Sequence, residues 1–167
     1  YNAYKEFVNA GLPTPLTYDS MEKFNKALLN NEIDFPVILK PRTGSGGKDV
    51  LLIENMALLQ IHWNDDESLI IQEYIDGISI DVDFYVDKHS RKMISIFPKE
   101  RINIRSGESD KAISINNQEL FELTEDMAKA FNLVGPLCCD IFMRDGKYYI
   151  LEINPRFGGS YPMAYSC

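Results

Sequence analysis

The sequence lacks an excess of positive charge, an apolar run of transmembrane length and a signal-peptide pattern. Its 167 residues include 25 aspartates and glutamates but 17 lysines and arginines, which gives a formal net charge of −8. This balance argues against a surface that binds nucleic acid or an anionic membrane. We therefore expect neither partner, and an anionic ligand has to be held by cations that cluster locally.

Cysteine and histidine are scarce, with 3 and 2 residues, and neither forms a metal-binding pattern. Cys138 and Cys139 are adjacent in a strand-like segment, so their side chains point to opposite faces. Without Cys-x-x-Cys spacing or nearby histidines, zinc binding is not indicated, and we expect both thiols to pack in the core. His62 and His89 are isolated and are interpreted as structural or surface residues. The thiols fit a reducing compartment, and we expect a cytoplasmic location.

Two familiar phosphate-binding motifs are also missing. A P-loop follows the pattern G-x-x-x-x-G-K-[ST], but counting back from Gly47-Lys48 places Arg42 at the first glycine and Asp49 at the hydroxyl position. A protein kinase has its glycine loop before the strand lysine and requires H-R-D and D-F-G sequences, which are absent here. Both classes are therefore excluded.

A glycine-rich loop does follow a predicted strand that ends in Lys40, in the run Leu-Lys-Pro-Arg-Thr-Gly-Ser-Gly-Gly-Lys at 39–48. Glycine lets backbone N–H groups approach phosphate oxygens closely, and Lys40 adds a fixed positive charge. Taken alone, the same glycines also suit a flexible hairpin turn. A second basic cluster, diluted by acidic neighbours, is either another anion site or a solvated face. This cluster comprises Lys99, Arg101, Arg105 and Lys111.

Three polar residues near the ends of a predicted hairpin point to metal binding. Asp140, Glu152 and Asn154 lie at or beside two apolar segments, 137–143 and 147–153. Hard oxygen ligands of this kind suit Mg²⁺ or Mn²⁺, and Mg²⁺ usually completes its shell with substrate phosphates. The alternative is that the three residues form a solvated strand face.

The register of this hairpin decides whether a cation can bridge the two carboxylates. A two-residue turn at Asp145-Gly146 would pair Asp140 with residue 151, the neighbour of Glu152, which leaves the two carboxylates on opposite faces. A three-residue loop that begins at Arg144 instead puts the polar residues on one face. We predict the three-residue loop or an equivalent bulge.

Alternating elements without an internal repeat predict an α+β fold in two lobes, 1–74 and 75–167, that meet near residues 74–77. Helices are predicted over 3–10, from a capping box at 19–22 to about residue 30, over 55–63 and over 118–133. Strands are predicted over 36–40, 49–53, 68–74, 78–86, 93–97 and in the final hairpin. The strict apolar–polar alternation over 78–86 is typical of a half-buried strand, and 98–111 is interpreted as a basic loop.

The order of these motifs resembles the ATP-grasp family from about residue 3 to the end of the sequence. It comprises a strand lysine, a glycine loop, the hinge Gln-Glu-Tyr-Ile-Asp-Gly at 72–77, the basic loop, and D-x₁₁-E-x-N-P-R from Asp140. The runs 99–109 and 154–159 look like the carbamoyl-phosphate-synthase-like branch. The resemblance implies an ATP-grasp fold, with two α+β lobes of mostly antiparallel sheets that clamp a nucleotide.

The resemblance also implies roles for individual residues. Lys40 would contact the α- and β-phosphates of ATP, and the glycine loop would close over them. The binding residues of this loop are Gly44, Ser45, Gly46, Gly47 and Lys48. Base-binding roles fall to hinge residues and to apolar side chains that are equally plausible as core, namely Gln72, Glu73, Tyr74, Ile75, Ile38, Phe142 and Leu151. The magnesium ligands are matched by Asp140, Glu152 and Asn154. The residues expected to meet the γ-phosphate or an acyl phosphate are Arg156, Arg105 and Arg101. Ser79 stands where the family often has a ribose-binding glutamate, and Asp81 on the same strand face is a candidate substitute.

The implied activity is that of an ATP-dependent, ADP-forming ligase that activates a carboxylate or bicarbonate as an acyl phosphate for attack by an amine or ammonia. Two other classes stay open: a regulatory module that binds nucleotide without turnover, and a kinase that stops at phosphoryl transfer. The chain opens on Tyr1 and stops just after a glycine-rich segment, so we expect it to belong to a longer protein with neighbouring domains. The sequence names neither the acid nor the amine, and it gives no oligomeric state.

Overall fold

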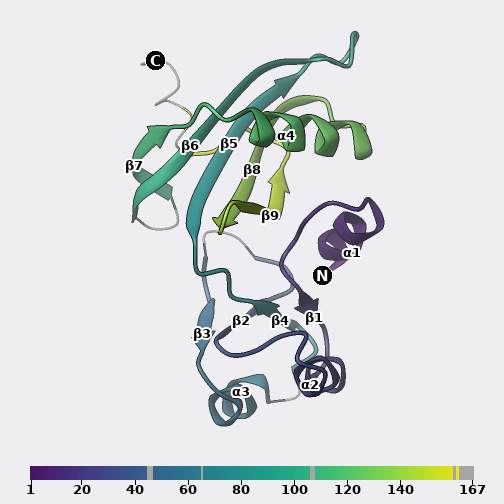
Figure 1. Cartoon of the computed structure of the whole chain (residues 1–167), viewed down its shortest axis with the longest axis vertical. Helices are drawn as coiled ribbons and strands as arrows, with labels where there is room; N and C mark the ends of the chain where they lie inside the picture. Colours follow the sequence, from purple (N-terminus) through teal and green to yellow (C-terminus); the bar gives the residue numbers. More distant parts are fainter. Residues whose placement is uncertain (45–46, 65, 106–107, 160, 162–167) are drawn as a thin grey trace. The chain divides into compact units, whose positions relative to one another are not determined.

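The computed structural model describes residues 1–44, 47–64, 66–105, 108–159 and 161, apart from the side chains of 104–110. The chain divides into two compact units, residues 1–6 with 15–76 and residues 7–14 with 77–167. Each unit contains one antiparallel sheet (Figure 1), which confirms the predicted α+β class. The helices are α1 (Asn2–Asn9), α2 (Met21–Leu29), α3 (Met56–Trp63) and α4 (Gln118–Ala130). The strands are β1 (Thr17–Tyr18), β2 (Val37–Pro41), β3 (Leu51–Ile53), β4 (Leu69–Glu73), β5 (Ile78–Val86), β6 (Met93–Arg105), β7 (Glu108–Ser114), β8 (Gly135–Arg144) and β9 (Lys147–Asn154).

The first unit has a four-stranded sheet in the order β1-β4-β2-β3, and α2 and α3 pack against one face of it. Val37 and Leu39 of β2 point into this core, where they join Phe24 of α2 and Leu59 of α3. Because side chains alternate along a strand, Lys40 belongs to the opposite face of the sheet. The hydrophobic core on one face therefore leaves the other face available for polar residues.

Side-chain caps define where two helices begin. Asn55 accepts a hydrogen bond from the backbone of α3 at 3.0 Å, as expected for the helix predicted over 55–63. The capping box predicted at 19–22 is off by one position, because Ser20 is the cap and its Oγ accepts from Lys23 N at 3.3 Å. Asp19 makes an ion pair of 2.7 Å with the Lys23 ammonium instead. Among the helices of the described residues, none is long and apolar enough to cross a membrane.

The second unit has a five-stranded sheet in the order β7-β6-β5-β8-β9, and α4 covers one face of it (Figure 1). Alternate residues of β5, Ile80, Val82 and Phe84, are buried in this core together with Leu120 and Met127 of α4. The remaining residues of β5 and their neighbours on adjoining strands form the opposite face. That face carries Asp81 and Asp83 of β5 and Asp140 of β8.

The prediction of a basic loop over 98–111 is wrong for most of that range, because these residues lie in the β6–β7 hairpin. The prediction of a half-buried β5 is also wrong, because Asp81 and Asp83 are 3% and 1% exposed. Both errors have one cause: Lys99 of β6 lies directly opposite Asp81, and Arg101 follows two residues later. Cations on one strand neutralise carboxylates on the next, so a charged strand face becomes buried.

Candidate functional site

The β8–β9 hairpin places the predicted metal ligands by means of a bulge. Asp145 and Gly146 form a two-residue turn with φ of 53° and 74°, and Arg144 pairs with Lys147 across it. The predicted three-residue loop is therefore wrong. The equivalent bulge is present: the register shifts next to Asp140, which lies opposite Glu152 rather than one residue short of it.

This register puts the three polar residues on the sheet face opposite α4. Asp140 pairs with Glu152, and Asn154 pairs with Cys138 two residues along the same strands. The Asn154 amide donates a hydrogen bond of 3.0 Å to Glu152 Oε1. Two carboxylates and an amide oxygen are donors of the kind that Mg²⁺ or Mn²⁺ takes, so the residues present fit such an ion.

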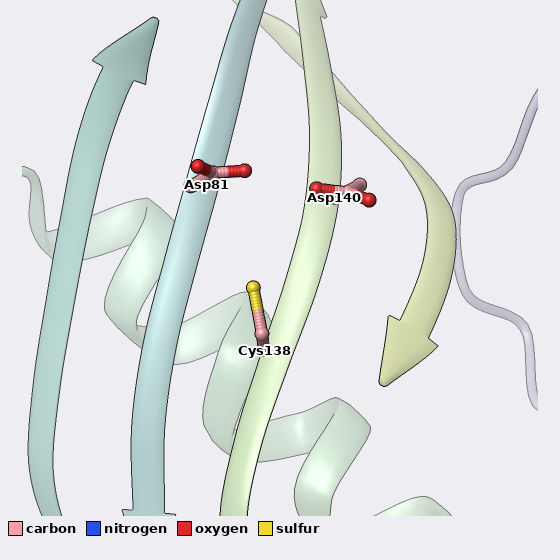
Figure 2. A group of neighbouring side chains, drawn as sticks. All are labelled: Asp81, Cys138 and Asp140. Carbon is pink, nitrogen blue, oxygen red and sulfur yellow. The ribbon is translucent and has the colours of Figure 1, made fainter. Parts of the chain in front are cut away.

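A guanidinium already lies between two of the carboxylates of this face. Arg101 Nε donates to Asp81 Oδ1 at 2.6 Å, and its Nη2 forms ion pairs with both Asp81 and Asp140. Figure 2 shows Asp81 on β5 beside Asp140 on β8, with Cys138 nearby, and one ligand atom of each lies within 4.8 Å of the others. Asp81, proposed from the sequence as a ribose-binding substitute, is thus held by Arg101.

The surroundings of Asp140 disfavour the negative charge of its carboxylate. Burial raises the pKa of the Asp140 carboxyl to about 8; the Arg101 charge lowers it, while hydrogen bonds with Asp81 and Glu152 raise it further. A metal binds the deprotonated form, so a cation at this site would displace the proton and supply the positive charge that the buried carboxylate needs. Asp140 is thereby set apart from an ordinary solvated aspartate.

A second buried pair lies two residues further along β5. Asp83 forms an ion pair with Lys99, and their side chains are 0% and 1% exposed. The other carboxylate oxygen, Oδ1, accepts a hydrogen bond of 2.7 Å from Gly158 N. A Cβ at position 158 would lie 2.9 Å from Cys138 Sγ, so only glycine fits against the sheet here. The segment that follows the predicted metal ligands is therefore anchored by a hydrogen bond to the interior of the second unit.

In the first unit, Lys40 lies on the sheet face opposite the helices. Its ammonium donates to Gln72 Oε1 at 2.8 Å, and Gln72 Nε2 donates to Thr17 Oγ1 at 2.9 Å. In the glycine loop after β2, Gly47 has φ of +66°, a left-handed conformation that suits glycine. Gly44 and Lys48 are exposed. Ser45 and Gly46, which the sequence also assigns to this loop, lie outside the described residues.

The other residues assigned from the sequence have varied surroundings. Arg156 is exposed and donates to Phe157 O at 2.9 Å. Glu73 N donates to Leu16 O at 2.7 Å. Arg105 ends β6, and its side chain is not among those described. The partly buried apolar residues are Ile38, Tyr74, Phe142 and Leu151, whereas Ile75 is 4% exposed. Their roles toward a nucleotide stay predictions.

Sequence reasoning missed Thr17, Asp83 and Gly158, and it saw Gln72 only as part of the hinge. Each of these acts through a partner that is 16 or more residues away along the chain. The one usable signal was the pair of aspartates in β5 followed by lysine and arginine at matching spacing in the next segment. That pattern predicts cross-strand ion pairs if the segment is taken as a strand.

Known proteins share this architecture. A family model described as an ATP-grasp domain matches residues 1–160. The large chain of the arginine-specific carbamoyl phosphate synthase of Bacillus subtilis is 24% identical over 160 residues, which cover 89% of this chain and 15% of that protein. The chain therefore spans a small part of the length of this relative.

Solved structures agree on the fold. N5-carboxyaminoimidazole synthetase from Staphylococcus aureus, complexed with ADP, matches with a TM-score of 0.75 and 18% identity, over 97% of this chain and 45% of that one. A second match is the biotin carboxylase domain of 2-oxoglutarate carboxylase from Hydrogenobacter thermophilus, in complex with MgADP, ADP and bicarbonate. It has a TM-score of 0.70 and 19% identity, over 96% of this chain and 40% of that one. Two antiparallel sheets with this element order, and a family model that matches from the first residue to residue 160, make this chain a member of the ATP-grasp family.

Proposed function

We propose that this chain binds ATP with Mg²⁺ as part of an ADP-forming ligase, which activates a carboxylate or bicarbonate as an acyl phosphate for attack by an amine or ammonia. The observation that carries the proposal is the bulge in the β8–β9 hairpin, because it sets Asp140 directly opposite Glu152. The similarity to a carbamoyl phosphate synthase chain, and to a biotin carboxylase domain in complex with MgADP and bicarbonate, supports this class of reaction.

The binding roles follow from charge and position. Lys40 and the glycine loop after β2 would hold the phosphates. Asp140, Glu152 and Asn154 would hold the cation, which when bound neutralises charge on the transferring phosphoryl group. Arg101 is anchored to Asp81 and would remain beside the cation; Arg105 and Arg156 are the further candidates for the γ-phosphate. Base binding falls to the hinge and to Ile38, Phe142 and Leu151.

The first step needs little from the protein beyond positioning. An oxygen of the acid attacks the γ-phosphorus while the bond to the β-phosphate oxygen breaks, which gives ADP and an acyl phosphate. A carboxylate is already anionic, so no general base has to remove a proton. The amine then attacks the acyl carbon, inorganic phosphate leaves, and the nitrogen loses a proton. Exclusion of water is required because the acyl phosphate hydrolyses.

Calorimetric titration with ADP, with and without Mg²⁺, tests the binding part of this proposal on the chain itself. Glu152→Gln should weaken Mg²⁺-dependent binding by about tenfold or more while it leaves Mg²⁺-free binding nearly unchanged, because it removes one ligand charge. Glu125→Gln, on the exposed side of α4, is the matched control and should bind as the parent does. A Glu152→Gln variant that binds MgADP like the parent would contradict the metal assignment.

Turnover separates the ligase from the two other classes. With the acid, ATP and the acceptor amine present, a ligase releases the amide, ADP and inorganic phosphate, whereas a kinase stops at the acyl phosphate, which added hydroxylamine traps as a hydroxamate. A regulatory module binds nucleotide and produces neither. This assay belongs on the longest protein that contains the chain, since the chain covers less than half of each solved relative described above.

A further inference from the structure

Three polar side chains from three strands meet on the face of the first sheet that α2 and α3 do not cover. Thr17 of β1 pairs with Gln72 of β4, and β4 pairs with β2, which carries Lys40. Thr17 and Gln72 are 2% and 6% exposed, so their polar atoms depend on protein partners. The distances are 2.8 Å from Lys40 Nζ to Gln72 Oε1 and 2.9 Å from Gln72 Nε2 to Thr17 Oγ1.

The direction of this hydrogen-bond chain is fixed at its buried end. Thr17 Oγ1 donates its proton to Pro15 O at 2.9 Å, so toward Gln72 its oxygen is an acceptor. The Gln72 amide must therefore present its NH₂ group to Thr17 and its carbonyl oxygen to Lys40. A flipped amide would set two donors against each other at Lys40 and two acceptors against each other at Thr17.

The neutrality of Gln72 has a consequence for Lys40. The amide oxygen holds the ammonium in place by a charge-assisted hydrogen bond without adding negative charge beside it. The partner of Lys99 in the second unit is instead a carboxylate, that of Asp83. An amide partner therefore positions a lysine without itself competing with an anionic ligand.

We propose that Gln72 and Thr17 are positioning residues that orient the Lys40 ammonium toward the phosphates of a nucleotide. Gln72 acts directly on Lys40, and Thr17 acts through Gln72 by fixing its amide orientation. This inference rests on the proposed function, since it takes Lys40 as a phosphate-binding residue. It adds a role for Gln72 that does not involve the base, and a role for Thr17.

The test compares two substitutions at one atom. Thr17→Val is nearly isosteric but removes the hydroxyl, so the Gln72 amide loses its acceptor and is free to flip. We expect the dissociation constant for ADP to rise about five- to tenfold. Thr17→Ser keeps the hydroxyl and should restore most of the affinity. Thr124→Val is the matched control, because Thr124 is equally buried and its hydroxyl bonds to Leu120 O in α4.

Adenosine provides the readout that a general structural role would not give. It has no phosphate, so a loss confined to the orientation of Lys40 should leave adenosine binding at its parental level in Thr17→Val. An equal loss for ADP and adenosine would mean that the whole site is disturbed and would overturn the inference. Competition against a fluorescent nucleotide measures both ligands, and circular dichroism checks that each variant is folded.

Gln72→Glu is the second, independent variant. A carboxylate in place of the amide would still accept from Lys40 but neutralise it, so ADP affinity should fall, and circular dichroism checks that the variant, which lacks the donor to Thr17, is folded. Unchanged ADP binding in this variant would overturn the inference, even if Thr17→Val failed to fold. If the parent chain does not bind ADP, or if Lys40→Ala binds ADP as tightly as the parent does, the proposed function fails instead. If Lys40→Ala weakens ADP binding but Thr17→Val and Gln72→Glu do not, the positioning role is refuted and the proposed function stands.

Discussion

Replacing Lys99 by methionine removes the cation from a buried ion pair and leaves the Asp83 carboxylate behind. The two side chains are 1% and 0% exposed, so water cannot take the place of the ammonium. Breaking such a pair from one side destabilises a protein by about 3–5 kcal/mol. Gly158 N still donates to Asp83 at 2.7 Å, which places the expected loss near the lower limit, about 3 kcal/mol.

Thermal unfolding measures this loss. For a chain of this size, about 3 kcal/mol corresponds to a fall of about 6–12 °C in the melting temperature. Hydrogen exchange should assign the loss to β5 and β6, because the pair joins these two strands. Lys129→Met is the matched control: its ion pair of 3.0 Å with Glu125 is exposed to solvent, so its loss should leave the melting temperature nearly unchanged.

A double variant separates the buried charge from the lost packing. Asp83→Asn combined with Lys99→Met replaces the carboxylate by a neutral amide whose oxygen can still accept from Gly158 N. It should be more stable than Lys99→Met alone, although it carries more substitutions. If Lys99→Met melts no lower than Lys129→Met, or if the double variant is the less stable, then the buried pair does not act as reasoned here.

Two further outcomes follow from the second unit. Gly77→Ala should lower the free energy of unfolding by about 2–3 kcal/mol or more, because the added Cβ would lie 2.3 Å from Met143 O. Gly44→Ala is the control, because a Cβ added there has no atom within 4 Å. Equal melting temperatures of the two variants would refute the clash. Burial raises the pKa of the Cys138 and Cys139 thiols, so the reactive thiolate is scarce and forms only at higher pH than in an exposed cysteine. Mass spectrometry after alkylation at pH 8 should find both thiols protected in the folded chain and modified in urea, and rapid native labelling would contradict their burial.

The sequence predicted best those elements whose signals are local. The Asn55 cap was enough for α3, and the alternation in 78–86 was enough for β5. The turn at Asp145-Gly146 is likewise a local signal, yet a two-residue turn without a bulge would have separated Asp140 from Glu152. The bulge was predicted only because the chemistry of the ligands required it.

What the sequence did not yield depends on partners that are far apart along the chain. Asp81 and Asp83 alternate with apolar residues as solvent-facing residues do, and only the pairing of β5 with β6 shows that Lys99 and Arg101 cover them. Gln72 gives no local sign that its amide joins Lys40 to Thr17. Periodicity reports which face a residue occupies, but the burial of that face depends on what lies across from it.

The buried pair of Asp83 and Lys99 should be insensitive to ionic strength. Mobile ions screen charges that are in contact with solvent, and they have little effect on a pair from which solvent is excluded. Exposed cations such as Lys48 and Arg156 are screened, so an anion held by them is released as salt rises. Salt therefore distinguishes two kinds of charge in this chain: the buried ion pair within the sheet keeps its interaction as salt rises, whereas the exposed cations proposed to bind an anion lose theirs.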